Sequence, residues 1–162
     1  REVAALPAGR RVPIISHWGV TGGDFVGQAG TALQTVDFTV VQTFSFFRAD
    51  QGKVAEVLKT TEKLFDIHRA EDIQAPVGFA HAYDLTHILA RAIDGAGTTD
   101  RSTVRDALEK VENYHGLIRT FERPFTAERH EALGSEDLLM ARYRADGALV
   151  PIDSINKDER AR

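Results

Sequence analysis

The first 47 residues follow a strand–loop–helix–strand order, and this order most constrains the fold. Residues 11–16 (RVPIIS) form a short apolar run, which is typical of a buried strand. A glycine-rich loop follows over residues 17–24, and residues 25–33 then carry apolar side chains at helical spacing. Residues 36–47 are rich in β-branched and aromatic types and predict a second buried strand. This order predicts an α/β fold.

Helices dominate the middle of the chain. Asp50 is predicted to begin a second helix, and a third runs from residue 75 or 76 to residue 93, where Gly95-Ala96-Gly97 ends it. Thr99 or Asp100 is predicted to cap a fourth helix. The predicted stripe of the third helix consists of Ala80, Tyr83, His87, Ala90 and Ile93.

The last third of the chain returns to strand-like patterns. Residues 117–121 and 138–143 predict strands, and a turn at Asp146-Gly147 leads to a further strand over residues 149–152. The polar residues 156–162 are expected to fray. These strands are too few for a self-contained doubly wound sheet, and the chain starts at Arg1 rather than Met. We therefore expect a processed product or a piece of something longer.

Composition excludes several classes of protein. The net charge of −4 makes a nucleic-acid surface unsuitable, because few groups would neutralise phosphates. The sequence has no cysteine, which removes disulfides, thiolate metal sites and thiol catalysis. It also contains no apolar run of 18 residues that would cross a bilayer.

Phosphate and metal sites receive no support from the motifs. The loop with Gly19 and Gly23 lacks the Gly-Lys-Ser/Thr ending of a P-loop, and Asp24 after it would repel an anion. On the third predicted helix, His81 and His87 are six residues apart and so do not share a face. We expect these histidines to hydrogen-bond to neighbouring loops, and we expect no metal or other cofactor.

No catalytic set is found either. The serines lack an elbow motif, and the paired carboxylates Glu71-Asp72 and Glu136-Asp137 are adjacent, so they point in different directions. We expect a protein without enzymatic activity. A small α/β hydrolase or transferase remains the alternative from another class.

The pair His17-Trp18 lies where an apolar strand ends and the glycine-rich loop begins. In open α/β sheets, ligands bind beyond the carboxyl ends of strands. Trp18 would stack on a planar or apolar group, while its indole N–H or His17 donates a hydrogen bond. The alternative is that Trp18 only plugs a domain edge. The predicted ligand-binding residues are Trp18, His17, Gly19 and Phe79.

Five stretches together resemble a known family. They are PIISHWG (13–19), QAG (28–30), AHAYDL (80–85), YHGLI (114–118) and YRADG (143–147). In order and spacing they resemble the C-terminal portion of type I periplasmic solute-binding proteins, which serve ABC importers of branched-chain amino acids and amides.

The resemblance implies a two-lobed fold with Rossmann-like lobes, incomplete in this chain. Residues 1–47 would end the second lobe, residues 48–155 would pass through the hinge into the first lobe and cross back, and residues 156–162 form the tail. It implies a periplasmic or other extracytoplasmic protein, soluble or lipid-anchored, that binds a small amino-acid-like, amide or aromatic solute and docks on ABC permease subunits. A receptor's ligand-sensing domain with the same fold is the alternative.

The family usually presents an acidic residue to the ligand's ammonium group at the position of Trp18. This departure disfavours an α-amino acid and favours a less cationic or more aromatic solute, because a cation–π contact contributes only about 0.5–2 kcal/mol. The family's serine and threonine ligands would lie upstream of Arg1. We therefore expect weak ligand binding by this chain alone, and a homo-oligomer or swapped dimer that covers its open apolar faces.

Overall fold

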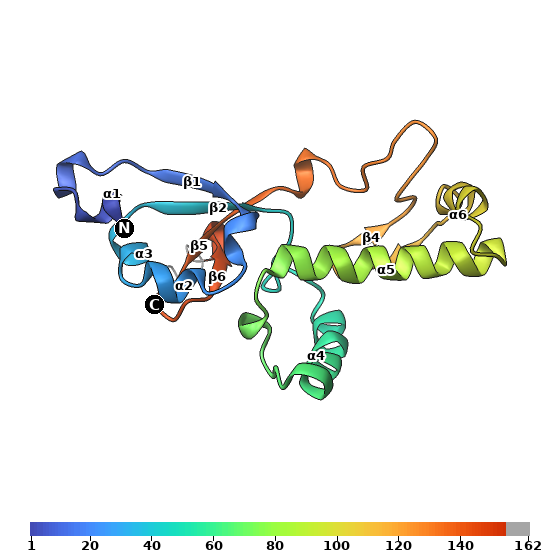
Figure 1. The fold of residues 1–162 in the computed structure, drawn as a ribbon, viewed down its shortest axis with the longest axis horizontal. Coiled ribbons are helices and arrows are strands. Elements are labelled where there is room, and N and C mark those ends of the chain that lie inside the picture. Colours follow the sequence, from blue (N-terminus) through green and yellow to red (C-terminus); the bar gives the residue numbers. More distant parts are fainter. Residues whose placement is uncertain (155–162) are drawn as a thin grey trace.

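The computed structural model describes residues 1–154, and these residues form two lobes (Figure 1). We call them the sheet lobe, which carries the four-stranded sheet, and the helical lobe, which carries the long helices. The chain leaves the sheet lobe after residue 42 and re-enters it at residue 139. The two lobes lie end to end, so the molecule is elongated (Figure 1). The predicted tail, residues 156–162, lies outside the described residues.

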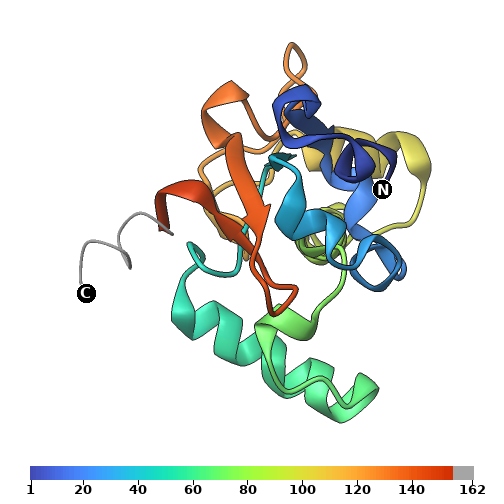
Figure 2. The same ribbon diagram turned by 90° about the vertical axis from the view of Figure 1, so that its left-hand side faces the viewer.

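The sheet lobe combines parallel and antiparallel pairing. Its elements are α1 (Glu2–Ala5), β1 (Ile14–His17), α2 (Phe25–Ala29), α3 (Ala32–Thr35), β2 (Phe38–Gln42), β5 (Leu139–Tyr143) and β6 (Leu149–Pro151). The strand order is β1-β2-β5-β6. β1 and β2 are parallel, with Ser16 opposite Val40, whereas β2–β5 and β5–β6 are antiparallel. A parallel pair needs a crossover, which α2 and α3 supply (Figure 2).

The two faces of this sheet differ in burial. On one face, the rings of Phe25, Phe38 and Tyr143 pack together, with centroids 5.6–6.4 Å apart. On the opposite face, Ile15 is 68% exposed and Met140 is 38% exposed. The prediction of a buried strand over residues 11–16 is therefore wrong, because the strand begins at Ile14, lies at the edge of the sheet, and leaves one of its faces open.

Two predicted elements of this lobe are shorter than expected. The helix predicted over residues 25–33 is divided at Gly30, whose φ of 57° and ψ of −137° belong to a region that only glycine adopts readily. The strand predicted over residues 36–47 ends at Gln42, because the chain then crosses to the helical lobe and pairs no further. The hairpin turn at Asp146-Gly147 is confirmed, with Gly147 at φ 85°.

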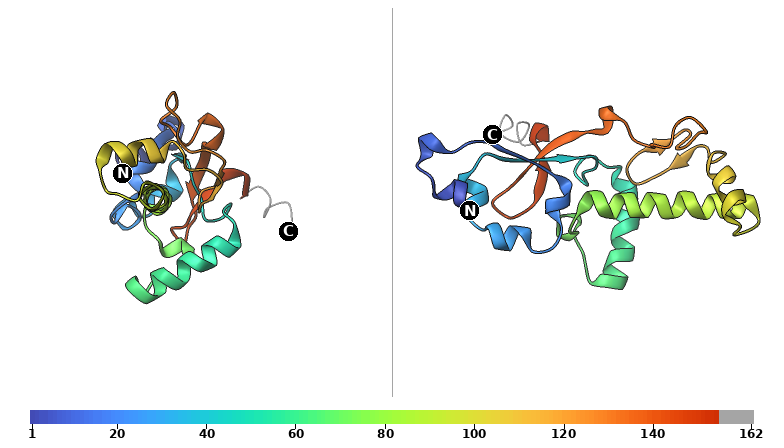
Figure 3. Two further views of the ribbon diagram at one scale, coloured as in Figure 1. Left: turned by 90° about the vertical axis from the view of Figure 1, so that its right-hand side faces the viewer. Right: turned by 45° about the horizontal axis from the view of Figure 1, so that its top comes forward.

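The helical lobe is built around its longest helix. Its elements are α4 (Gln51–Phe65), α5 (Pro76–Ala96), α6 (Arg101–Leu108), β3 (Tyr114–His115) and β4 (Thr120–Phe121). α5 runs the length of the lobe, α4 crosses it near the hinge, and α6 lies at the far end (Figure 3). Asp50 caps α4 by accepting from the Lys53 N–H at 2.9 Å, Asp100 caps α6, and left-handed Gly97 ends α5, as predicted.

The predicted apolar stripe of α5 is largely wrong. The buried positions are Val77, Ala80, Asp84, Ile88 and Ala92, whereas His87 and Ala90 are exposed. A polar residue, Asp84, occupies the centre of the true stripe because it has hydrogen-bond donors there. The strand predicted over residues 117–121 is reduced to β4, since Leu117 is buried in the turn between β3 and β4.

Two apolar clusters form the core of the helical lobe. The first lies near the hinge and consists of Phe44, Phe46, Val54, Val57, Ile73, Val77, Ala80 and Leu117. The second lies further along α5 and consists of Ile88, Ala92, Val104, Val111, Tyr114 and Phe121. Because the first cluster takes Phe44 and Phe46 from the crossing after β2, it fixes the start of the helical lobe against the end of the sheet.

Candidate functional site

The loop after β1 places Trp18 at the junction of the lobes. The backbone turns into a short 3₁₀ helix, Trp18–Thr21, in which His17 Nδ1 accepts a hydrogen bond from the Gly19 N–H at 3.1 Å. The His17 and Trp18 ring centroids are 3.5 Å apart. His17 is exposed, whereas Trp18 is half-buried and packs against the first apolar cluster.

Trp18 faces a histidine on α5. The ring centroids of Trp18 and His81 are 6.4 Å apart, and His81 Nε2 is 2.9 Å from Thr43 Oγ1. Burial lowers the pKa of His81, and the negative charge of Asp84 opposes this shift only in part. The neutral imidazole therefore links α5 to the crossing after β2, beside Trp18.

Phe79 lies on another side of the same junction. It is half-buried against the first cluster, and its ring centroid is 6.1 Å from that of Phe46. The structure thus gathers His17, Trp18 and Gly19 in one turn, and it places Phe79 against the crossing rather than in ring contact with Trp18 among the described residues. Their role in ligand binding stays a prediction.

The histidines expected to bond to loops behave differently from each other. His81 does so through Thr43, but His87 is exposed and contacts Tyr83, with ring centroids 4.6 Å apart. Within residues 1–154, no group of three or more His, Asp or Glu side chains is placed to hold a metal ion.

A recess of about 320 Å³ lies between the two lobes. Its walls come from the loop after β1 and the start of α2, the end of β2, the crossing, the segment before α5, and the β5–β6 hairpin. They include Thr21, Asp24, Phe25, Gln42, Phe44, Ser45, Phe46, Phe47, Ala75, Pro76, Ala141, Tyr143 and Leu149. The size is within the range of small-molecule sites. None of the four predicted residues lines this recess.

Gln42 is a deeply buried polar residue of the recess lining. It ends β2 and is 1% exposed, yet neither its amide nitrogen nor its amide oxygen has a hydrogen-bond partner within the protein. Tyr143 is on the same face of the sheet, and burial raises the pKa of its hydroxyl to about 12, so the group stays neutral. The lining of the recess therefore mixes aromatic and aliphatic side chains with many polar and charged ones.

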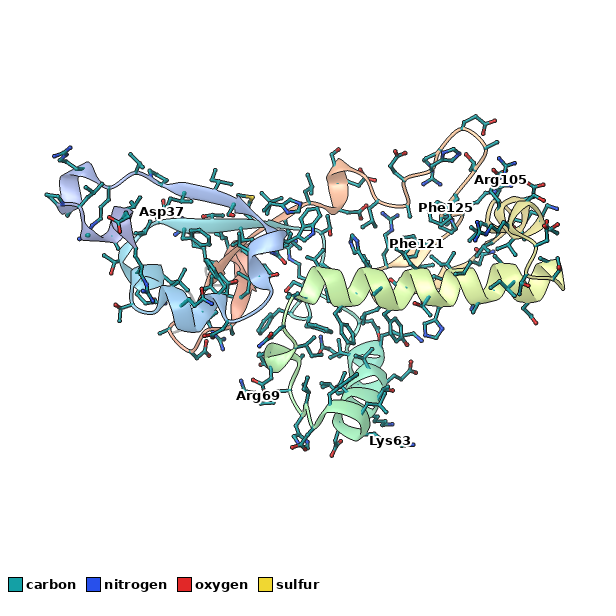
Figure 4. All side chains as sticks on the ribbon, viewed as in Figure 1. Asp37, Lys63, Arg69, Arg105, Phe121 and Phe125 are labelled. Atoms are coloured by element: carbon teal, nitrogen blue, oxygen red, sulfur yellow. The ribbon has the colours of Figure 1, made fainter. Side chains whose placement is uncertain are left out.

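The lining of the recess carries more acidic than basic side chains. It includes Asp24, Glu71, Asp72 and Asp146 and one basic residue, Arg69. Arg69, which Figure 4 labels on the loop between α4 and α5, lies 3.4 Å from Asp72 and 3.8 Å from Glu71. The guanidinium is thus paired with these carboxylates. The charges of the lining therefore favour neutral or cationic solutes over anions.

Gln42, Thr43 and His81 were missed as site residues by reasoning from sequence alone. A signal existed for Gln42, because a polar amide follows Val40 and Val41 in the middle of a predicted buried strand. Thr43 and His81 are 38 positions apart in the sequence, so no local sequence motif indicates that they form a hydrogen bond.

Comparison with known proteins shows what fold this is. No family model matches the chain, and no curated protein sequence matches it. A periplasmic binding protein type 1 from Bordetella pertussis superposes with a TM-score of 0.71 at 21% identity, over 89% of this chain and 40% of that one. The fold is that of a type I periplasmic binding protein. It is present here in part.

Two further solved structures have the same type I fold. A leucine-binding protein, LivK, from Thermotoga maritima gives a TM-score of 0.67 at 17% identity, over 93% of this chain and 40% of its own. The branched-chain amino acid transporter substrate-binding protein LivJ from Streptococcus pneumoniae, solved with isoleucine, gives 0.62 at 22% identity, over 86% and 37%. The chain therefore spans about two-fifths of the structures it matches. Within the described residues, no helix has the length and apolarity to cross a membrane.

Proposed function

We propose that this chain belongs to the extracytoplasmic solute-binding component of an ABC importer, located in the periplasm or an equivalent compartment. It binds a small amino-acid-like, amide or aromatic solute between its lobes, hands it to permease subunits and catalyses no reaction. The type I fold supports this proposal, since the proteins that share it are described as transporter substrate-binding proteins or extracellular ligand-binding receptors.

The interlobe recess is the observation that carries the proposal. Its walls come from both lobes. Gln42, in its lining, ends a strand, and open α/β sheets bind ligands at the ends of strands. Relative movement of the lobes about the crossings would open and close such a space. A solute held there would be bound without any nucleophile or metal.

A sensing domain of a receptor is the second candidate. A structure from Rhodopseudomonas palustris described as an extracellular ligand-binding receptor has a TM-score of 0.63 at 16% identity. Both candidates require a solute to bind between the lobes. They differ only in the partner that responds to binding, which is a permease in one case and the rest of a receptor in the other.

A solute screen tests the proposal. Because this chain alone is expected to bind weakly, amino acids, amides and aromatic acids are added at high concentration. Thermal shifts should then identify a stabilising solute, since a ligand that binds only the folded state raises its stability increasingly as it saturates the site. Calorimetry with that solute then measures its affinity. A panel in which no solute of any class shifts the transition contradicts the proposed function.

Trp18 supplies an internal check, since it is the one tryptophan of the sequence. If Trp18 contacts the solute, Trp18→Ala should weaken binding by about 1–3 kcal/mol, as expected for the loss of an aromatic contact. Trp18→Phe keeps a ring and should lose less. Equal affinities of the original protein, Trp18→Ala and Trp18→Phe would show that Trp18 does not contact the solute. Its role would then be to cover the edge of the domain.

A further inference from the structure

We propose that His81 is a proton-sensitive contact between the two lobes. Its neutral imidazole favours the arrangement in which the lobes are packed together, and its protonation at mildly acidic pH favours their separation and the release of a bound solute. The release of solute rests on the proposed function, whereas the separation of the lobes does not. The position of His81 and the groups around it support this role.

His81 lies where the two lobes and the crossing after β2 meet. It belongs to the second turn of α5 in the helical lobe, and its ring centroid is 6.4 Å from that of Trp18, which follows β1 in the sheet lobe. Figure 1 shows the loop after β1 next to the start of α5. His81 Nε2 is also 2.9 Å from Oγ1 of Thr43, the first residue of the crossing. A change in the charge of His81 therefore acts on the contact between the lobes.

Trp18 holds the sheet lobe against the helical lobe. Its ring is half-buried and packs against the first apolar cluster, whose residues belong to the helical lobe and the crossing. Its backbone is tied to its own lobe, because its carbonyl accepts a hydrogen bond from the Thr21 hydroxyl at 2.7 Å. Separation of the lobes would withdraw the Trp18 ring from the cluster and expose both Trp18 and His81 to water.

The charged groups around His81 come from two elements. On α5, Asp84 is three residues further along, and its buried carboxylate already accepts three hydrogen bonds from the β3–β4 hairpin. On the loop after β1, the exposed His17 lies against Trp18, with ring centroids 3.5 Å apart, and adds a like charge when protonated. The crossing contributes the uncharged hydroxyl of Thr43. Burial outweighs the attraction of Asp84 and lowers the pKa of His81.

Protonation of His81 destabilises the packed arrangement through its charge rather than through a lost hydrogen bond. The Thr43 hydroxyl can accept from a protonated ring nitrogen as well as it can donate to a neutral one, so this bond survives. A cation–π contact requires a cation within about 6 Å of the ring centroid. The 6.4 Å between the rings of His81 and Trp18 is longer than this. The buried imidazolium is therefore compensated only in part, by Asp84, until separation exposes it to water.

Proton binding and lobe separation are therefore linked. The separated state exposes His81, whose pKa then returns to about 6.5, so this state binds a proton more readily than the packed state. The stability that the neutral ring gives to the packed arrangement is complete above about pH 6.5 and is lost as the pH falls from there through the lowered pKa. A solute held between the lobes requires the packed arrangement, so its affinity should fall about threefold between about pH 7.5 and 5.5.

The fluorescence of Trp18 tests the lobe contact without any solute, because Trp18 is the one tryptophan of the sequence. Between about pH 7.5 and 5.5, the emission maximum of the whole chain should move to longer wavelength and quenching by acrylamide should increase, while the far-ultraviolet circular dichroism stays constant. An emission maximum that stays in place overturns the proposal. A shift that appears only together with a loss of circular dichroism also overturns it, because protonation would then unfold the chain.

Two histidine variants identify the responsible ring. His81→Gln keeps a side chain that can hydrogen-bond to Thr43 and does not titrate, so its emission should no longer depend on pH. His17→Gln removes the other imidazole in contact with Trp18 and should retain most of the shift. A shift that persists in His81→Gln, or that disappears in His17→Gln, overturns the proposal.

Calorimetry at the same two pH values extends the test to solute binding. The probe is the solute that stabilises the chain most in the thermal-shift panel, such as isoleucine or benzamide, whose charges do not change over this range. Its affinity should fall about threefold for the original protein and for His87→Gln, a control at an exposed site on α5, but should stay constant for His81→Gln. A pH-independent affinity of the original protein overturns the proposal and leaves the binding function intact. Failure of every solute to bind contradicts the binding function instead, and the emission of Trp18 then decides the role of His81 alone.

Discussion

Asp84 joins α5 to the β3–β4 hairpin. Its carboxylate is 2% exposed and accepts hydrogen bonds from the Leu117 N–H at 2.7 Å, the Ile118 N–H at 2.9 Å and the Tyr114 hydroxyl at 2.9 Å. Position 116 is glycine because a Cβ there would lie 2.7 Å from both carboxylate oxygens. Burial, and then the bond to Asp84, raise the pKa of Tyr114, which keeps its hydroxyl a donor.

Asp84→Asn should lower the free energy of unfolding by about 2–4 kcal/mol, because an amide group would face a backbone N–H donor in place of a carboxylate oxygen. Chemical denaturation measures this change. Asp94→Asn, on an exposed position of the same helix, is the control and should change stability by less than about 0.5 kcal/mol. Similar effects of the two variants would contradict the role given to Asp84.

His81 should make stability depend on pH. Burial lowers its pKa, so the unfolded chain binds a proton more readily than the folded one. The stability contributed by the neutral ring is complete above the ordinary histidine pKa of about 6.5 and is lost as the pH falls. His81→Gln should reduce the drop in thermal midpoint between pH 7.5 and 5.5. The other five histidines are exposed and act equally in both proteins, so an unchanged drop would count against this account.

Residues with local signatures were predictable, whereas residues paired across the fold were not. The sequence placed Trp18 correctly at the end of a strand because a glycine-rich loop follows an apolar run. It gave no indication that His81 contacts Thr43 or that Gln42 reaches a recess, because those environments depend on how the lobes meet.

At the scale of elements, the helix ends followed the sequence closely. Asp50, Asp100 and Gly97 act through atoms only a few residues away, so their roles could be predicted without tertiary structure. The buried face of α5 could not be predicted, because the helix is buried around Asp84, whose hydrogen-bond partners lie 30 or more residues away in the sequence. Helical spacing of apolar residues alone therefore predicted the wrong buried face for α5.

The cap of α4 gives a test at this scale. Asp50→Ala removes the acceptor of the Lys53 N–H and should lower the free energy of unfolding by about 1 kcal/mol. Asp50→Ser keeps a capping oxygen and should stay within a few tenths of a kcal/mol of the original protein. A loss of the same size in both variants would show that the charge of Asp50, rather than its hydrogen bond, stabilises α4.

For the whole molecule, exposed apolar side chains and an unpaired strand edge are consistent with a fold that is present in part. Ile15 and Met140 are exposed on one face of the sheet, and Leu85 and Leu89 are 49% and 43% exposed, one turn apart on α5. In the part of the chain that the structure describes, β1 pairs on one side only, with β2. Apolar faces and sheet edges of this kind promote association.

We therefore predict that the chain self-associates at micromolar concentration, which sedimentation velocity would measure. Ile15→Lys places a charge on the open face and edge strand and should shift the equilibrium toward monomer. Thr35→Lys, at an exposed site on α3, adds the same charge elsewhere and should leave association unchanged. A stable monomer at these concentrations would contradict the prediction.

Binding between the lobes is the central claim, and hydrogen–deuterium exchange tests it most directly. Exchange is compared with and without the solute that gives the largest thermal shift. The account predicts slower exchange in residues 21–26 of the sheet lobe and residues 73–76 of the helical lobe together, because both segments line the recess. Protection confined to one lobe, or no protection in either segment, would contradict it.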